Sequence, residues 1–443
     1  MESFITQRAK VRKKIGVRTK NRAILSNFAH EMTKYNTYTL KNGLRIIHLP
    51  SDSQVVFCGY DIAAGTRNEL PGEEGLAHFC EHMSFKGTTR RNAIQIINAI
   101  EGLGGELNAF TNKEDTVYYA AISKEHFSQV INVLTDIVFH SQYPQQEIDK
   151  EVEVICDEIE SYNDSPAELI YDEFENLLFE GHPLGHNILG NADQLHTYTT
   201  ADALRFVRRN YQPEKMVFFV YGDINFKRLC KNLEHLTPDS NISPAAPSSS
   251  ACVTQKKAQF IEQDRATHQA HVMTGCRAYA YNDPRRLTLY LLNNILGGPG
   301  MNARLNLSLR ERHGLVYTVE STMVTYGDTG IWSIYFGCDH HDIKRCCRLV
   351  RHELDRLMQK PLSKPQLIAA KRQLKGQLAI ACDNREQFAL DFGRSYLHHG
   401  HERDLETLYR RIDAITSEEL QAVANDLFAA DNLTTLIFSK NSH

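Results

Sequence analysis

The 443-residue chain lacks several features that mark particular classes of protein. It has no excess of positive charge, because 54 aspartates and glutamates outnumber 50 lysines and arginines, so its charge does not predict a nucleic-acid partner. It also lacks any apolar run near the roughly 18 residues of a membrane span. Met216–Tyr221 is among the longest such runs. These absences predict a soluble protein that neither binds nucleic acid nor spans a membrane.

A disulfide framework is not indicated either. The ten cysteines are scattered, with two of them adjacent at Cys346-Cys347. Small secreted domains space their cysteines more regularly. The basic segment before Glu31 has no apolar stretch of the kind found in secretory signals, although a transit peptide or an upstream extension with an alternative start remains open. We therefore expect a reducing, cytoplasmic location.

Length and composition predict two domains. A chain of this size exceeds one hydrophobic core, and residues 237–250, with three prolines and five serines, are typical of a linker. The linker separates residues 33–236 from residues 251–443, while residues 1–32 form a basic extension that we expect to be mobile. Both halves alternate short strands with longer helices, and Asn42-Gly43 predicts a type I′ hairpin turn. We expect an α+β fold of two similar mixed-sheet domains with helices packed on the sheets.

The segment His78-Phe79-Cys80-Glu81-His82 carries the clearest chemical motif. In a helix, two histidines four residues apart lie on one face, and the glutamate three residues after the first shares that face. Neutral imidazoles are good zinc ligands, and an adjacent glutamate that is not a ligand can accept a proton from water bound to the zinc. The alternative is two ordinary histidines on an amphipathic helix.

Catalytic zinc usually has three protein ligands, so a third must come from elsewhere. Residues 145–160 have apolar residues at helical spacing. They are Ile148, Val152, Ile155 and Ile159. Glu151 and Glu158 are seven positions apart and therefore lie on one stripe of that helix. One of them could bind the metal and the other could orient a histidine, although acidic residues on such a helix are more often a solvated face.

The chain resembles the inverted-motif zinc peptidases, the family of pitrilysin, insulysin and mitochondrial processing peptidase, and most closely a two-domain, bacterial-type processing-peptidase-like member. Besides the motif and Glu158, the resemblance rests on residues 64–69, 83–88 and 104–111. It implies one zinc ion per chain with His78, His82 and Glu158 as ligands, Glu81 as the general base, and Glu151 as the carboxylate that orients a ligand.

The same resemblance implies substrate-binding residues. It places Asn108 and Ala109 on a strand at the edge of the sheet, where an extended peptide can bind as an added strand, and it adds Phe79 to the substrate-binding set. From the residues alone, an internal strand with Asn108 in a turn or bulge is an equally good interpretation.

The second half has no such motif, but it contains the glycine-rich segment Leu296–Asn302. A phosphate-binding loop is excluded, because the Lys-Ser or Lys-Thr pair is missing and Pro299 removes a donor amide. In the resembled family this region is a flexible loop, followed by an arginine and a tyrosine that match Arg310 and Tyr317. These two would bind the substrate and donate a hydrogen bond to the oxyanion. Without the resemblance, both would be interpreted as surface or packing residues.

Other histidines do not predict a metal site. His340-His341 and His398-His399-Gly400-His401 lie in polar stretches without the helical spacing of the motif. We expect them to be solvated surface residues.

Together these observations predict a zinc-dependent endopeptidase that hydrolyses peptides or unfolded protein segments. A non-catalytic assembly subunit with the same fold is the main alternative, and a hydrolase of a non-peptide substrate is another. Relatives with a closed chamber need four such domains, so the resemblance implies a dimer. One chain carries both the metal motif and the Arg310/Tyr317 pair, which favours a homodimer over a heterodimer with a related subunit.

Overall fold

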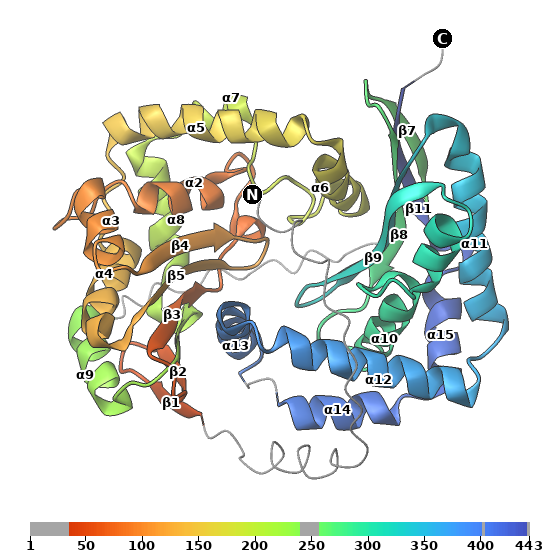
Figure 1. Ribbon diagram of the computed structural model, residues 1–443. Coiled ribbons are helices and arrows are strands. Elements are labelled where there is room, and N and C mark those ends of the chain that lie inside the picture. The colour runs from red at the N-terminus through yellow and green to blue at the C-terminus, as the bar shows by residue number, and fades with distance from the viewer. Residues whose placement is uncertain (1–34, 240–256, 401–403, 441–443) are drawn as a thin grey trace.

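The computed structural model describes residues 35–239, 257–400 and 404–440. The expected basic extension at residues 1–32 and most of the expected linker at residues 237–250 lie outside these ranges. The described residues form two lobes, each built on one sheet (Figure 1). The predicted α+β fold with two similar mixed-sheet domains is confirmed.

The sheet of the first half has six strands. They are β1 (Asn36–Thr39), β2 (Arg45–Leu49), β3 (Val55–Ile62), β4 (Glu106–Thr111), β5 (Thr116–Ser123) and β6 (Met216–Tyr221). Their order is β1-β2-β6-β3-β5-β4, with β2 and β6 parallel and the other neighbours antiparallel. Strand β4 therefore lies at the edge of the sheet, where its main chain pairs with β5 on one side only.

The turn between β1 and β2 differs from the expected type I′. The hairpin forms, but Gly43 has a φ of 90° whereas Asn42 does not have positive φ. The amide of Gly43 donates to the carbonyl of Leu40, and the amide of Leu40 donates to the carbonyl of Leu44. This is a type I turn closed by a glycine in the left-handed region, the usual three-residue hairpin loop.

The second sheet repeats this arrangement with one strand fewer. Its strands are β7 (Phe260–Asp264), β8 (Ala270–Ala278), β9 (Val316–Thr325), β10 (Gly330–Cys338) and β11 (Thr434–Ser439). The order is β7-β11-β8-β10-β9, and only β7 and β11 are parallel. In the first sheet the last strand of the chain segment, β6, lies between β2 and β3, and in the second sheet the last strand, β11, lies between β7 and β8. The two halves therefore share this feature of their topology.

Each half also contains helices, most of which pack within their own half. In the first half they are α2 (Leu76–Ser84), α3 (Ala93–Glu101), α4 (Phe127–Phe139), α5 (Gln145–Asn163), α6 (Pro166–Leu178), α7 (Ala192–Leu195), α8 (Thr200–Asn210) and α9 (Phe226–Leu236). In the second half they are α10 (Arg286–Gly297), α11 (Ile343–Gln359), α12 (Lys364–Ala381), α13 (Arg385–His399), α14 (Leu405–Ala414) and α15 (Ser417–Leu427). None of these helices is long and apolar enough to cross a membrane.

Two helices pack on the sheet of the other half. Helix α13 packs against β3 and β6 of the first sheet, and helix α6 packs against β8 and β11 of the second. Leu390 and Phe392 of α13 share a buried apolar cluster with Phe219 of β6. Phe174 of α6 shares another with Met273 of β8. Both helices lie between the lobes (Figure 1), so each half completes the core of its neighbour.

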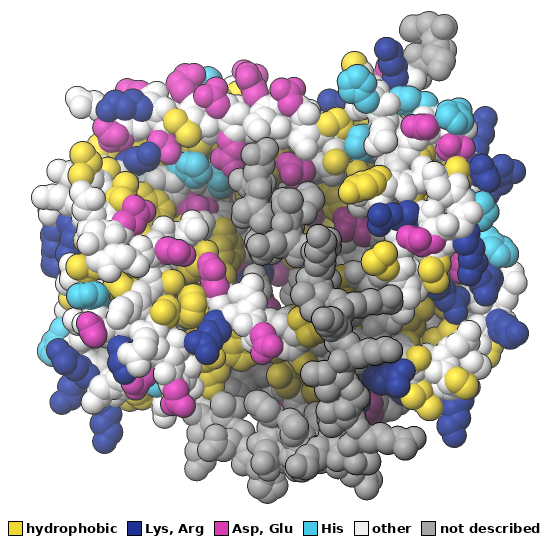
Figure 2. Space-filling view, viewed as in Figure 1, with side chains coloured by type: hydrophobic (Ala, Val, Ile, Leu, Met, Phe, Trp, Pro, Cys, Tyr) yellow, Lys and Arg dark blue, Asp and Glu magenta, His cyan; other side chains and the backbone are white. Residues whose placement is uncertain are grey.

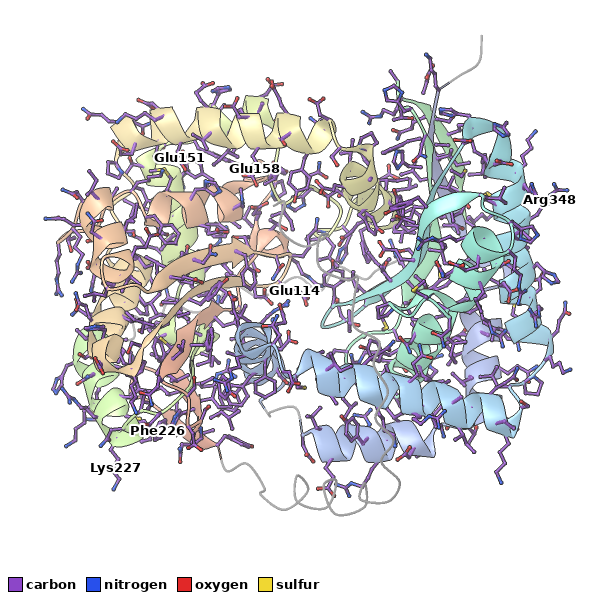
Figure 3. The ribbon with its side chains drawn as sticks, viewed as in Figure 1. Glu114, Glu151, Glu158, Phe226, Lys227 and Arg348 are labelled. Carbon is purple, nitrogen blue, oxygen red and sulfur yellow. The ribbon has the colours of Figure 1, made fainter. Side chains whose placement is uncertain are left out.

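Ion pairs join the two halves at the β4–β5 turn. Arg67 lies 2.6 Å from Glu114 of this turn and 2.5 Å from Asp328 of the β9–β10 turn. The carboxylate of Glu114 also accepts a hydrogen bond of 3.0 Å from the amide of Gly327. The label of Glu114 in Figure 3 marks this turn, close to the centre of the molecule.

The next residue, Asp115, is fully buried and lies 3.0 Å from Arg394 and 2.9 Å from His398, both on α13. His398 is exposed as a residue, as expected, but its ring is not simply solvated, because its side chain is 25% exposed and contacts the buried carboxylate of Asp115. Its partner is 283 positions away in the sequence, and histidine spacing alone carries no information about such a contact.

A pair of identical substitutions tests whether α13 is docked tightly on the first sheet. Gly393 lies against Phe219, and an added Cβ would come within 2.6 Å of the phenylalanine ring. Gly376 of α12 has open space around it. Alanine in an open helical position stabilises by about 0.5–1 kcal/mol, whereas overpacking a core costs about 1–3 kcal/mol. We expect Gly393→Ala to lower and Gly376→Ala to raise the denaturation midpoint in urea. Equal shifts would contradict close docking.

Candidate metal centre

Helix α2 is positioned by a buried carboxylate at its N-terminus. Glu69 accepts hydrogen bonds from the amides of Gly75 and Ala77, at 3.0 and 2.7 Å, and from His186 Nε2 at 2.7 Å. These amides would otherwise lack partners at the start of the helix, where a negative charge is favourable. Gly75 has a φ of 88°, a conformation that glycine adopts without strain. The start of the motif helix is thus fixed by residues outside the motif.

Helix α5 packs against α2. Ile148, Val152 and Ile155 are buried, and Glu151 and Glu158 leave α5 on the side that faces α2 (Figure 3). Other acidic side chains gather on the outer face of α5 (Figure 2). The predicted helix, its apolar stripe and the convergence of its two glutamates on the motif are therefore found together.

His78, His82 and Glu158 form a compact cluster. Their potential ligand atoms all lie within 4.8 Å of one another. Glu158 Oε2 is 3.9 Å from His78 Nε2 and 3.7 Å from His82 Nε2. The same nitrogen of both imidazoles thus faces the same carboxylate oxygen.

This donor set fits zinc. Ligand atoms 2.0–2.2 Å from a tetrahedral zinc ion stand roughly 3.3–3.6 Å apart, so the two distances from Glu158 Oε2 to the imidazoles need to contract by only a few tenths of an ångström. Two imidazoles and one carboxylate are a usual set for catalytic zinc, which leaves a fourth position for water. The side chains of His82 and Glu158 are 24% and 37% exposed, so the fourth position can be reached from solvent.

The second nitrogen of His82 is also held. Its Nδ1 lies 3.0 Å from Glu151 Oε1, and the other oxygen of Glu151 is 2.5 Å from Lys86 Nζ. A carboxylate in this position fixes the ring orientation of a metal-binding histidine and makes its free nitrogen a better ligand. Glu158 is therefore in a position to serve as a third ligand, and Glu151 is in a position to orient His82.

The environment sets the protonation of the central groups. Burial, with a smaller contribution from His82, lowers the pKa of His78 to about 3, which keeps its imidazole neutral. Burial also lowers the pKa of His82, but Glu151, Glu81 and Glu158 outweigh it and raise that pKa above its ordinary value. Burial raises the pKa of Glu81, against the hydrogen bond from Thr111. A carboxyl group with a raised pKa is suited to accept and release a proton near neutral pH.

The remaining predicted residues are not part of this cluster. Asn108 and Ala109 lie on the edge strand β4, with Asn108 exposed. Arg310 and Tyr317 lie in the second half, where the guanidinium is 5.4 Å from the centre of the tyrosine ring. Phe79 is fully buried, with its ring 5.6 Å from that of Tyr198. The side chain of Phe79 therefore offers no surface to a substrate, because it points from α2 into the core.

A cavity of about 800 Å³ lies between the two halves. Its walls include the β4–β5 turn together with Glu175, Tyr326, Arg394 and His398. None of the residues of the metal cluster lines it, so the cluster lies outside this cavity.

Three residues that contact the metal centre or helix α2 are not among the candidate site residues predicted from the sequence. They are Lys86, Thr111 and Glu69. Lys86 lies four positions after His82, so the spacing of the helix already places it on the face of the two histidines. Thr111 follows Leu107 and Ala109 at every second position of β4, which puts all three side chains on one face of the strand. Glu69 has no comparable pattern, because its contact with α2 depends on the path of a loop.

Comparison with protein families gives two matches. The family described as insulinase, peptidase family M16, matches residues 46–192, which include His78, Glu81, His82 and Glu158. The family described as the peptidase M16 inactive domain matches residues 197–374.

Several relatives are similar over most of the chain. An uncharacterized zinc protease of Streptomyces coelicolor is 31% identical over 88% of this chain and 86% of its own length. The uncharacterized zinc protease YmxG of Bacillus subtilis is 30% identical over 90% of this chain and 97% of its own.

Two solved structures share the fold. A protease from Helicobacter pylori is 22% identical, with a TM-score of 0.84 over 93% of this chain and all of that chain. A structure from Pseudomonas fluorescens, described as a peptidase M16 inactive domain, is 18% identical, with a TM-score of 0.82 over 92% of this chain and 98% of that chain.

Replacing Glu151 tests how the centre holds metal. Glu151→Gln keeps the shape of the side chain but removes the charge beside His82, and we expect zinc affinity to fall about 10- to 100-fold. The measurement is competition with a chromogenic chelator. Glu153→Gln is the matched control, because Glu153 lies on the same helix with its side chain 71% exposed, and it should leave zinc affinity unchanged. Equal affinities of both variants would exclude the orienting role of Glu151.

Proposed function

Since this chain belongs to the insulinase family, peptidase family M16, we propose that it is a zinc-dependent endopeptidase that hydrolyses peptides or unstructured polypeptide segments. One observation carries the proposal. The Nε2 atoms of His78 and His82 converge on one oxygen of Glu158, and the carboxylate of Glu81 lies on the same helix face. The proposed zinc content is one ion per chain.

Each group has a distinct task in this mechanism. Zinc, when bound by His78, His82 and Glu158, would make a water molecule more acidic and polarise the peptide carbonyl. Glu81 takes a proton from the attacking water and later gives it to the leaving nitrogen, so that water and one peptide bond become a carboxylate and an amine. Glu151 keeps His82 oriented throughout.

An extended peptide can bind at the free edge of β4. Main-chain hydrogen bonds to an edge strand give affinity without a strict sequence requirement, and Asn108 and Ala109 lie in the middle of this strand. The same strand ends at Thr111, which contacts Glu81. A peptide added there would run past the general base.

The alternative of a non-catalytic subunit is less well supported. The inactive-domain match covers residues 197–374, whereas the proposed ligands and Glu81 fall within the insulinase match at residues 46–192. A hydrolase of non-peptide substrates would share the metal chemistry, so only a cleavage experiment separates it from a peptidase.

We also propose that the active form is a dimer in which Arg310 and Tyr317 act on the partner subunit's site. Tyr317 is 78% exposed. Among the described residues, no hydrogen bond or ion pair joins either residue to the metal cluster of its own chain. Tyr317 could then donate to the oxyanion and Arg310 could hold the substrate main chain.

The first test removes the general base. Glu81→Gln should keep about one zinc per chain while cleavage of a peptide mixture falls about 100- to 10,000-fold. Zinc content is measured by elemental analysis, and cut sites are mapped by mass spectrometry. Wild-type protein that binds zinc but cuts no peptide would contradict the peptidase and favour the assembly subunit or the hydrolase of a non-peptide substrate. Loss of zinc from Glu81→Gln would instead make Glu81 a ligand.

The second test mixes two inactive parents. If Tyr317 acts across the dimer, a mixed dimer of Glu81→Gln and Tyr317→Phe contains one intact site. Random pairing of equal amounts should then restore about a quarter of wild-type activity, since half the dimers are mixed and each has one of two sites. Co-expressed and separately purified parents provide the comparison. No recovery above the parents would mean that each chain uses its own Tyr317.

A further inference from the structure

Within the described part of the chain, Glu81 makes one hydrogen bond. Thr111 Oγ1 donates to Glu81 Oε2 at 2.5 Å, and both side chains are buried, with exposures of 8% and 7%. The other oxygen of Glu81, Oε1, has no hydrogen-bond partner among the described residues. Thr111 therefore binds one oxygen of the carboxylate, Oε2, and leaves the other, Oε1, available to a water molecule.

Counting protons shows that this bond has a fixed direction. The hydroxyl of Thr116 lies 3.4 Å from that of Thr111, but Thr116 donates its own proton to the carbonyl of Ala64 at 2.8 Å. A threonine hydroxyl has a single proton. Thr111 can give its proton to Glu81 at 2.5 Å or to Thr116 at 3.4 Å, and the shorter contact to a carboxylate is much the stronger. The hydroxyl is thus committed to Glu81.

The position of Thr111 is itself fixed. It is the last residue of β4 and pairs with Thr116 of β5 across the turn. That turn contains Glu114 and Asp115, which bind Arg67 and Arg394. Because Arg394 belongs to α13 of the second half, the hydroxyl that contacts the general base lies on a hairpin anchored by both halves.

The second half contains a similar hydrogen bond between an edge strand and a helix, but the acceptor there is an asparagine and not a glutamate. Helix α10 packs on the edge strand β9, as α2 packs on the edge strand β4. There Ser321 Oγ donates to Asn293 Oδ1 at 2.5 Å, and Asn293 Nδ2 donates to the carbonyl of Ser321 at 2.9 Å. The chain therefore offers a matched bond between helix and edge strand at which no base is present.

We propose that Thr111 is the positioning residue for Glu81: its hydroxyl holds one oxygen of the carboxylate so that the other faces the water that attacks the peptide. This inference rests on the proposed peptidase function. It assigns Thr111 no contact with substrate or metal, so its effect must appear in turnover and not in binding.

The test compares Thr111→Val, Thr111→Ser and Ser321→Ala with wild type, all loaded with zinc. Thr111→Val keeps the shape of the side chain and removes the hydroxyl. We expect kcat for a peptide substrate to fall about 10- to 100-fold, the loss typical of a misplaced catalytic group, with KM and zinc content unchanged. Thr111→Ser retains the donor and should restore most of kcat. Ser321→Ala breaks the matched bond and should leave kcat as in wild type.

Three results would overturn the proposal. Unchanged kcat in Thr111→Val would show that Glu81 does not need the bond. An equal loss of kcat in Ser321→Ala would show that any loosening of a helix on its edge strand suffices. An equal loss in Thr111→Ser would show that the hydroxyl is not what matters. Absence of cleavage by the zinc-loaded wild type would instead reject the proposed function itself, which separates the two failures.

Discussion

The exchange of helices between the two halves is the constraint on which the rest of the structure depends. Helix α13 of the second half packs on the first sheet, and α6 of the first half packs on the second sheet. Without α13, apolar side chains such as Val117 and Phe219 would lose their cover, and exposing a large apolar side chain costs about 1.5–3 kcal/mol. The half that contains His78, His82 and Glu158 therefore depends on the other half for part of its core.

The three glutamates near His78 and His82 have different surroundings, and these surroundings affect their carboxyl groups differently. Glu81, Glu151 and Glu158 all lie close to the two histidines, and Lys86 pairs with Glu151. Glu151 is held by His82 and Lys86, and those contacts lower its pKa even though burial opposes them. Glu81 has a raised pKa because burial dominates. Glu158 is the most exposed of the three and turns an oxygen toward both imidazoles. The excess of negative charge favours a divalent cation.

Local periodicity predicted the parts of this site that lie on single helices. The spacing of His78, Glu81 and His82 placed them on one face of α2, and the spacing of Glu151 and Glu158 placed both on one stripe of α5. The choice of Glu158 as the ligand came from the family resemblance. The local sequence pattern does not predict contacts between residues that are far apart in the sequence. Phe79, one position after His78, turns about 100° around the helix into the core, and the contact of His398 with Asp115 depends on how α13 crosses to the other half. The choice of sheet for α6 and α13 likewise follows from complementary surfaces and not from periodicity.

The β4–β5 hairpin could take part in both substrate binding and catalysis, because the main-chain groups and the side chains of a strand point in different directions. Along β4 the main-chain groups of the edge lie in the plane of the sheet, where an added peptide would pair. The side chains of Leu107, Ala109 and Thr111 leave that plane on one face, and the last of them contacts Glu81 on α2. Pairing with a peptide therefore does not compete with the bond to Glu81. Any motion of the hairpin would displace both together, so the anchoring of Glu114 and Asp115 by the second half would keep a bound peptide and Glu81 in a constant relative position.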